Sequence, residues 1–277
     1  MDLTSPEKPS KATRLVKNKK SSFLSRDGRF HLLQGDSLVL LKDFPTDSVD
    51  LIFADPPYFL SNGGITCHSG QMVSVDKGKW DVSLGYEAIS SFTKSWLLEC
   101  QRVLKPTGSI WVSGTSHIIH IVGSLMMELG YKILNDITWV KPNPPPNLSC
   151  RYFTHATETL LWASKNKKAK HVFNYKLMKS ENNNKQMTSV WNLKAPTKEE
   201  KNFGKHPTQK PLALLDRIIK ASSNPGDLVI DPFSGSATTG LSAWKNGCNY
   251  IGIEKERSYN QLAVKRFEEL EKKFKSS

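Results

Sequence analysis

Four consecutive residues, Asp55-Pro56-Pro57-Tyr58, combine groups that could hold a planar amine. Two adjacent prolines fix φ and supply no N–H groups, so the backbone here is stiff and rich in hydrogen-bond acceptors. The Asp55 carboxylate and the Pro56 carbonyl could each accept a hydrogen bond, and the Tyr58 ring offers a face for stacking. These features suit an NH₂ group on an aromatic base. Taken alone, the same string could form only a turn.

Residues 229–240 have the pattern of a cofactor-binding turn, with an apolar strand, a run of small residues and the start of a helix. Gly235, Ala237 and Gly240 form a G-x-A-x-x-G variant of the nucleotide-cofactor fingerprint, and Glu254 ends the next expected strand. A carboxylate in that place could accept hydrogen bonds from both hydroxyls of a ribose, while small residues let the backbone approach the cofactor. Glu254 therefore favours a ligand site over a turn that serves packing alone.

Strand-like and helix-like stretches alternate from about Phe30 onward, which predicts an α/β fold with a mostly parallel, twisted sheet flanked by helices. Both strings follow a strand, and open α/β sheets bind ligands at the carboxyl ends of their strands. The expected strands are residues 29–33, 49–54, 109–113, 132–140, 158–163, 228–231 and 250–254. The expected helices are residues 87–104, 117–129, 211–222, 238–246 and 257–273.

The two strings together resemble the DNA amino-methyltransferases that use S-adenosylmethionine. Here the Asp-Pro-Pro-Tyr string precedes the glycine-rich one, which is the order of the β class. That order implies a Rossmann-like methyltransferase fold with a circularly permuted motif order and an inserted target-recognition region. Further matches over residues 30–270 are Gly35-Asp36-Ser37, Leu104-Lys105-Pro106-Thr107-Gly108 and His206-Pro207-Thr208-Gln209-Lys210-Pro211.

Residues 53–64 and 147–155 are similar to the smaller methylase of DpnII-type systems, which are type II restriction–modification systems. Members of that group methylate adenine N6 within GATC. The resemblance implies a site-specific adenine DNA methyltransferase that protects DNA from a cognate restriction endonuclease, with no need for contact between the two. It leaves open whether the chain forms a homodimer and whether the DNA is single- or double-stranded.

The resemblance also assigns roles to residues. As catalytic residues, Asp55, Pro56, Pro57 and Tyr58 would hold the flipped adenine, and residues 59–81 would close over it. The expected cofactor-binding residues are Asp36, Asp55, Thr208, Lys210, Asp231, Pro232, Phe233, Ser234, Gly235, Thr238 and Glu254.

Three of these residues have a specific expected partner on the cofactor. Asp36 would lie near its adenine amine, and Thr208 and Lys210 would lie near its methionine carboxylate. Ala237 stands where the family usually has glycine, and its methyl group is expected to loosen cofactor binding slightly.

The chain carries 39 Lys and Arg against 26 Asp and Glu, a net charge of +13 that suits a polyanionic partner such as DNA. Residues 1–29 hold eight basic and three acidic side chains (+5), and residues 163–210 hold twelve and three (+9). We expect residues 1–28 to be a solvated, disordered tail before a single domain, 29–277. The second segment interleaves lysines with aromatic residues, which favours target recognition at about 163–205. Its expected DNA contacts are Lys165, Lys167, Lys168, Lys170, Lys176 and Lys179.

Other functions compete with adenine methylation. A cytosine-N4 methyltransferase needs the same acceptors, and RNA or protein-glutamine methyltransferases share a Pro-Pro-aromatic string but usually place the cofactor string first. A dinucleotide oxidoreductase would not explain residues 55–58, and a DNA-binding module would explain only the basic charge. Cytosine C5 methylation needs a thiolate, ordinarily from a cysteine after proline, and no Pro-Cys pair occurs.

Composition narrows the setting of the protein. The four cysteines show neither disulfide nor zinc spacing, and no carboxylate lies at metal-site spacing from His117, His120 or His155, so we expect no metal. No apolar run approaches the roughly 18 residues of a membrane helix. Lysines recur through the N-terminus in place of an apolar signal segment. We expect a cytoplasmic protein without membrane contact.

Overall fold

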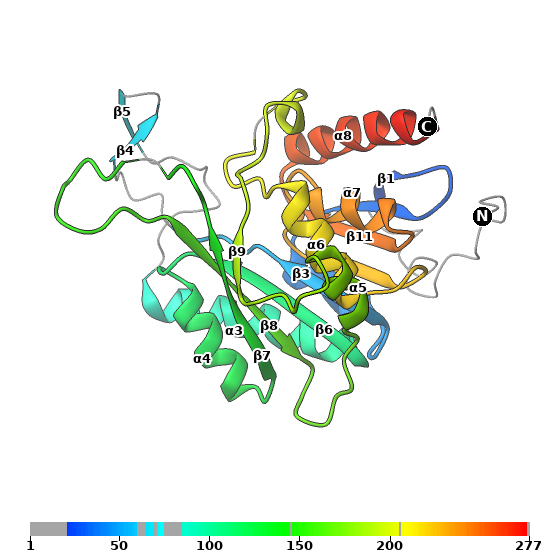
Figure 1. Cartoon of the computed structure of the whole chain (residues 1–277). Helices are drawn as coiled ribbons and strands as arrows, with labels where there is room; N and C mark the ends of the chain where they lie inside the picture. Colours follow the sequence, from blue (N-terminus) through cyan, green and yellow to red (C-terminus); the bar gives the residue numbers. More distant parts are fainter. Residues whose placement is uncertain are drawn as a thin grey trace.

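The computed structural model describes residues 21–59, 65–68, 71–74, 85–144, 146–204 and 206–275. Its main feature is a nine-stranded sheet in the order β1-β2-β11-β10-β3-β6-β8-β7-β9 (Figure 1). The strands are β1 Ser21–Leu24, β2 Phe30–Gln34, β3 Val49–Ala54, β6 Leu104–Gly114, β7 Lys132–Val140, β8 Thr157–Ser164, β9 Val190–Asn192, β10 Leu228–Asp231 and β11 Asn249–Glu254. A separate two-stranded sheet joins β4 Ile65–His68 to β5 Gln71–Ser74.

Five neighbouring strands, β2, β11, β10, β3 and β6, run parallel. Their carboxyl ends therefore meet along one edge of the sheet, which we call the cleft edge. β10 pairs with β3 with Val229 opposite Leu51 and Ile230 opposite Ile52. The two strings that the sequence singled out are thus adjacent in space, although 176 residues separate Asp55 from Asp231. The expected α/β fold with a permuted motif order is confirmed.

Strand β8 reverses the direction of the sheet. It pairs antiparallel with both β6 and β7, so the chain enters β8 at the cleft edge and leaves it at the opposite edge. β9 then pairs parallel with β7 and returns the chain toward the cleft edge. This reversal decides where the lysines that follow β8 can lie.

Helices cover both faces of the sheet, and each strand alternates between two cores. In β3, Ile52 and Ala54 pack with α2, α3 and α4, whereas Leu51 and Phe53 pack with α6, α7 and α8. Such two-sided burial explains why the strands are apolar runs. The helices are α2 Ser37–Leu40, α3 Tyr86–Val103, α4 Ile119–Glu128, α5 Tyr175–Glu181, α6 Leu212–Ser222, α7 Thr238–Lys245 and α8 Arg257–Lys275, with short 3₁₀ turns at Leu41–Asp43 and Glu199–Lys201.

The expected strands and helices are all present, with ends shifted by at most five residues. Two boundaries differ from expectation. β1 lies within the stretch expected to be a disordered tail, and pairs antiparallel with β2. α5 and β9 lie within residues 163–205, so part of the expected target-recognition segment belongs to the fold itself. Within the described ranges, no helix has both the length and the apolar character needed to span a membrane.

Candidate active site

The Asp55 carboxylate lies directly after β3, where its backbone is fixed by the sheet on one side and by two prolines on the other. Both of its oxygens accept hydrogen bonds. The Tyr58 hydroxyl donates to Oδ1 over 2.5 Å, and the Lys210 ammonium donates to Oδ2 over 2.6 Å. Lys210 lies two residues before α6, so the chain segment that leads into this helix closes the site. The sequence anticipated all three residues but not their mutual contact.

Burial and the neighbouring charges have opposite effects on the pKa values of Asp55 and Lys210. Burial raises the pKa of Asp55, and the Lys210 ammonium offsets that effect only in part. Burial would lower the pKa of Lys210, but the charges of Asp55, Tyr58 and Glu158 raise it well above its usual value. Lys210 is therefore a cation, and its role here is to hold Asp55. The expected contact of Lys210 with a methionine carboxylate would compete with this pairing.

The Tyr58 ring is buried, which bears on its expected role of stacking against a base. Its side chain is only 5% exposed and belongs to the core beside α3 and α4, and the Lys210 Nζ atom lies 5.3 Å from the ring centroid. A ring buried in this way presents its hydroxyl, not a free face, to the site. Stacking of a base on Tyr58 would require the ring to leave the core. Of the two prolines, Pro57 lines the cavity and Pro56 is buried.

The glycine-rich bend is built around Asp231, the last residue of β10. Its Oδ1 accepts from the Phe233 N–H over 3.0 Å and its Oδ2 from the Thr239 hydroxyl over 2.6 Å. Burial raises the pKa of Asp231 to about 7, despite these two hydrogen bonds and with help from the charges of Asp55 and Glu254. This carboxyl group can therefore take up a proton near neutral pH.

Ala237 occupies a left-handed backbone conformation, with φ of +55°, directly before α7. Such a conformation costs an alanine roughly 1–2 kcal/mol, which explains why a glycine would suit the place. Ala237 lines neither cavity described below. Its methyl group therefore acts on the backbone rather than on a ligand.

Glu254 connects the bend to the next strand. Its Oε2 accepts from the Gly235 N–H and its Oε1 from the Glu256 N–H, each over 2.8 Å. Burial raises the pKa of Glu254, and the backbone N–H groups oppose that shift. The carboxylate faces the same cavity as Asp55. Each carboxylate oxygen keeps a lone pair for a ligand hydroxyl.

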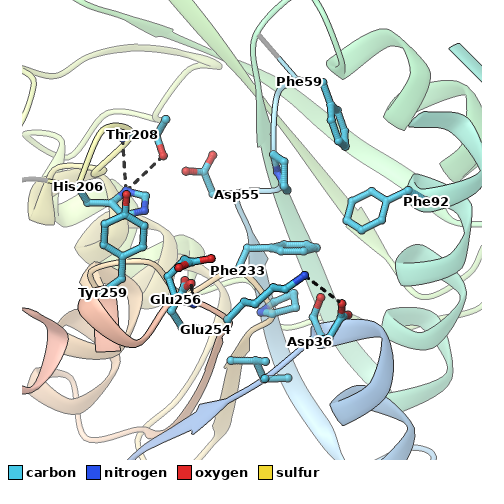
Figure 2. A pocket seen from close by; sticks show the side chains of 16 residues that line it. Asp36, Asp55, Phe59, Phe92, His206, Thr208, Phe233, Glu254, Glu256 and Tyr259 are labelled. Carbon is cyan, nitrogen blue, oxygen red and sulfur yellow. Dashed lines mark hydrogen bonds and ion pairs between the residues drawn. The ribbon is translucent and has the colours of Figure 1, made fainter. Parts of the chain in front are cut away.

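Residues of both strings line one cavity at the cleft edge (Figure 2). The Phe233 ring lies between Asp36 and Asp55, while His206, Thr208 and Tyr259 form the side opposite Phe59 and Phe92. Of the expected cofactor residues, this cavity is lined by Asp36, Asp55, Thr208, Pro232, Phe233 and Glu254. A smaller adjoining cavity, which shares Asp55, Thr208 and Phe233, is lined by the others, namely Lys210, Asp231, Ser234, Gly235 and Thr238.

The chemistry of the cavity fits an adenosine cofactor. Carboxylates of Asp36 and Glu254 can accept from an amine and from ribose hydroxyls, and the rings of Phe92 and Phe233 suit the apolar faces of adenine. Asp36 caps α2 by accepting from the Leu38 N–H over 2.9 Å, which fixes its side chain. Among the described residues, no group of three or more metal-binding side chains is arranged to hold a metal ion.

Sequence reasoning assigned no role to several residues of the site, although it placed His206 in a matched string. His206 stacks edge-on with Tyr259 at 4.2 Å, and burial lowers the pKa of His206 to about 3, so its ring is neutral. An added Cβ on Gly235 would lie 3.0 Å from the His206 ring, which explains the glycine there. The Oε2 atom of Glu158 lies 3.6 Å from the Nζ atom of Lys210. A lone carboxylate in the apolar strand β8 was the available signal for it.

The lysines expected to bind DNA do not lie at the cleft edge. Lys165 follows β8, whose residues Thr159 and Ser164 are separated by about 17 Å of strand, so it emerges at the opposite edge. Its ammonium pairs with Asp47 and donates to the Leu104 carbonyl over 2.7 Å. These contacts engage its ammonium at the edge opposite Asp55.

The other expected DNA contacts share this location. The exposed residues Lys167, Lys168 and Lys170 follow Lys165 along the same loop. Lys176 and Lys179 lie on α5, which packs against the C-terminal end of α6 through Asn174 and so also lies away from Asp55. The physical reason for the difference is the reversed direction of β8, which the local sequence does not reveal.

Comparisons with known proteins agree with this geometry. A family model described as DNA methylase matches residues 49–265. The Type II methyltransferase M2.DpnII of Streptococcus pneumoniae is 53% identical over 238 residues, which cover 86% of this chain and 89% of that protein. The Type II methyltransferase M2.MboI of Moraxella bovis is 48% identical over 251 residues, which cover 91% and 92%. The crystal structure of the M1.HpyAVI–SAM complex is 32% identical, with a TM-score of 0.64 over 85% of this chain and 97% of that one.

Proposed function

Because this chain belongs to the DNA methylase family, as a site-specific DNA methyltransferase that uses S-adenosylmethionine, we propose that it methylates adenine N6 within GATC. The DpnII and MboI methylases named above are the relatives that carry the choice of sequence. Membership of this family removes the oxidoreductase and the binding module without catalysis as alternatives.

One observation carries the reaction chemistry. Asp55, which follows β3, and Glu254 and Phe233, which belong to the cofactor string, line a single cavity. A ribose held by Glu254 and an amine held by Asp55 are therefore neighbours. This is the arrangement that direct transfer between them requires, since reacting atoms must come within about 3–3.5 Å.

The chemistry then follows from the acceptors at the corner. An exocyclic amine is a weak nucleophile because its lone pair is delocalised into the base. We propose that Asp55 and the Pro56 carbonyl accept its two hydrogens, which favours a tetrahedral nitrogen with an available lone pair. S-adenosylmethionine, when bound, supplies a methyl group on a cationic sulfur. The Tyr58 hydroxyl, which donates to Oδ1, and the Lys210 ammonium, which donates to Oδ2, hold the Asp55 carboxylate in place for this contact.

Adenine N6 is preferred over cytosine N4 because Asp, not Ser, begins the Pro-Pro string, as in the adenine-specific members that the sequence resembles. Cytosine N4 remains the second candidate on chemistry alone, since both amines need the same acceptors. The nature of the modified nucleoside separates the two.

DNA must approach the cleft edge, and the base must leave the stack to reach Asp55. Two described segments border that edge. They are residues 146–156, between β7 and β8, and residues 193–204, between β9 and α6. The first carries Arg151 and the second Lys194 and Lys198, all exposed. We propose that these segments, rather than residues 165–181, contact DNA phosphates.

We also propose that the enzyme acts in the cytoplasm beside a restriction endonuclease of the same specificity.

The test uses a duplex with one GATC site, a matched duplex with a scrambled site, and methyl-labelled S-adenosylmethionine. Digestion to nucleosides and mass spectrometry should find N6-methyladenine in the first duplex only. N4-methylcytosine would replace the adenine assignment. Equal labelling of both duplexes would contradict the proposed target sequence, and a third arm with single-stranded DNA defines the strand requirement.

A further inference from the structure

Glu158 is a buried carboxylate outside both strings. It lies on β8, its side chain is 11% exposed, and its Oε1 forms an ion pair with Lys141. Its Oε2 has no hydrogen-bond partner among the described residues and lies 3.6 Å from Lys210 Nζ. Buried polar atoms are nearly always paired, because an unpaired one forfeits its hydration. Oε2 forms an ion pair with Lys210 but no hydrogen bond within the described residues, and such an oxygen close to Asp55 calls for a function.

The Lys210 ammonium stands between two carboxylates, and it donates a hydrogen bond to Asp55 but forms only a longer ion pair, of 3.6 Å, with Glu158. Its three hydrogens can be accounted for by Asp55 Oδ2 at 2.6 Å, the Tyr58 oxygen at 3.0 Å and the Thr208 carbonyl at 3.4 Å. Its side chain is 6% exposed, so water does not compete for it. A lysine ammonium on a flexible stem can exchange such partners by small rotations. A shift of under about 1 Å would bring it within hydrogen-bond distance of Glu158.

The proposed reaction gives a reason for that exchange. Asp55 Oδ1 already accepts from Tyr58 and Oδ2 from Lys210, so an incoming amine meets a carboxylate whose charge is largely neutralised. A cofactor bound in the cavity that Asp55 lines would supply a second positive charge. Moving Lys210 toward Glu158 would return acceptor strength to Asp55 at the moment when the amine needs it.

We propose that Glu158 is a positioning residue that takes over the Lys210 ammonium when the target base enters, leaving Asp55 Oδ2 to the amine. This inference rests on the proposed function, because it assumes that Asp55 accepts an amine hydrogen. No bond is made or broken in the exchange, and Lys210 keeps its proton throughout.

The charges of both groups support this exchange. Burial would raise the pKa of Glu158, but the ammonium groups of Lys210 and Lys141 outweigh it and lower that pKa. Glu158 is thus an anion ready to receive Lys210. Lys141, at the end of β7 and 28% exposed, holds Glu158 from the outer side. Lys141 thus holds Oε1, while Oε2 faces the Lys210 ammonium at 3.6 Å.

The experiment is a double-mutant cycle of Glu158→Gln and Lys210→Met, read by single-turnover methyl transfer at saturating cofactor. Glu158→Gln keeps the shape and removes the charge. In the native background we expect kcat to fall roughly 10- to 100-fold, as for loss of a hydrogen bond to a charged group, with the cofactor Kd within about twofold. In the Lys210→Met background the same change should alter kcat less than about twofold, because Glu158 acts only through Lys210.

Equal losses in the two backgrounds would overturn the inference, since Glu158 would then act without Lys210. An unchanged rate in Glu158→Gln would overturn it as well. Melting temperatures identify variants that fail to fold. If Glu158→Gln is one of them, Glu158→Asp, which keeps the charge on a shorter stem, should show the same dependence on Lys210. Failure of the proposed function is separate, because it would show as native enzyme that makes no N6-methyladenine.

Discussion

The hydroxyl group of Tyr58 lies 2.5 Å from Oδ1 of Asp55, while the ring that carries it is buried in the core. This relationship changes the meaning of the Asp-Pro-Pro-Tyr string. Two prolines hold Asp55 and Tyr58 at a spacing that lets one side chain orient the other. Tyr58 therefore orients the carboxylate, and in the proposed reaction surfaces other than its ring would bind the target base.

Tyr58→Phe separates the hydroxyl from the ring. It keeps the buried ring and removes the hydrogen bond to Asp55, so we expect kcat to fall at least about 10-fold with little change in cofactor affinity. Single-turnover methyl transfer and equilibrium cofactor binding measure the two effects. Tyr131→Phe is the matched control, because Tyr131 also donates from a buried ring, to the Leu97 carbonyl over 2.8 Å. A native rate in Tyr58→Phe would favour stacking by the ring alone.

Cofactor binding should weaken in mild acid through Asp231. Burial raises its pKa to about 7 in the free enzyme, and a cationic ligand favours the anionic form. Binding then releases a proton below pH 7, so Kd should rise by about 10-fold between pH 8 and pH 6. Isothermal titration in buffers of different ionisation enthalpy measures both Kd and the released proton.

The matched pair for this prediction is Asp231→Asn and Asp227→Asn. Asp227 also has a pKa raised by burial, but it lies at the amino end of β10 and outside both cavities. Asp231→Asn should flatten the pH dependence and Asp227→Asn should retain it. The same slope in all three proteins would assign the proton elsewhere.

The same group also affects folding. Because the folded pKa of Asp231 lies above its unfolded value near 3.8, the folded protein binds the extra proton between about pH 4 and pH 7. Its contribution to the free energy of unfolding is therefore complete below that range and is lost as pH rises through 7.

DNA binding tests the position of the basic residues. Replacing Arg151, Lys194 and Lys198 by Ala should reduce the slope of log K against log salt by about 0.9 for each phosphate that the protein no longer neutralises. Replacing Lys167, Lys168 and Lys170 by Ala removes the same charge at the opposite edge and should leave the slope unchanged. Fluorescence anisotropy at several salt concentrations gives both slopes. The reverse pattern would restore the loop after β8 as the DNA-binding surface.

Gly240 in α7 should not tolerate a methyl group. An added Cβ would overlap the Tyr250 ring and lie 2.6 Å from the Phe30 ring, and both rings are buried. Gly240→Ala should lower the free energy of unfolding by about 1–3 kcal/mol or more, through overpacking. Gly123→Ala in α4 is the control, since its Cβ would meet only the end of Leu161 at 3.3 Å and gains helix propensity. Urea denaturation compares them, and equal stability of the two variants would contradict the packing argument.

The sequence predicted those parts of the fold that local pattern determines. β7 and β10 have the expected bounds because β10 is a short apolar run and β7 is rich in apolar and β-branched residues, and each follows a glycine-containing turn. β1 and β9 escaped prediction because they have four and three residues and owe their existence to strands distant in sequence. Trp191, which is buried against Trp111, was the local sign of an edge strand in β9.

The site shows the same division. The residues after β3 and β10 were predictable because the carboxyl ends of parallel strands meet at one edge. The pairing of Lys210 with Asp55 and the position of Glu158 close to Lys210 depend on the order of strands in the sheet. A short stretch of sequence does not predict that order. The location of Lys165 away from Asp55 has the same cause, because the antiparallel strand β8 carries the loop that follows it to the far edge, before β9 returns the chain.

In the proposed reaction, Asp55 accepts a hydrogen bond from the amine while the cofactor string holds the methyl donor in the same cavity. The most direct measurement is single-turnover methyl transfer to a GATC duplex by Asp55→Ala, with cofactor affinity measured on the same preparation. We expect the rate to fall at least about 100-fold, with cofactor still bound. Transfer at a near-native rate with unchanged cofactor affinity would contradict it.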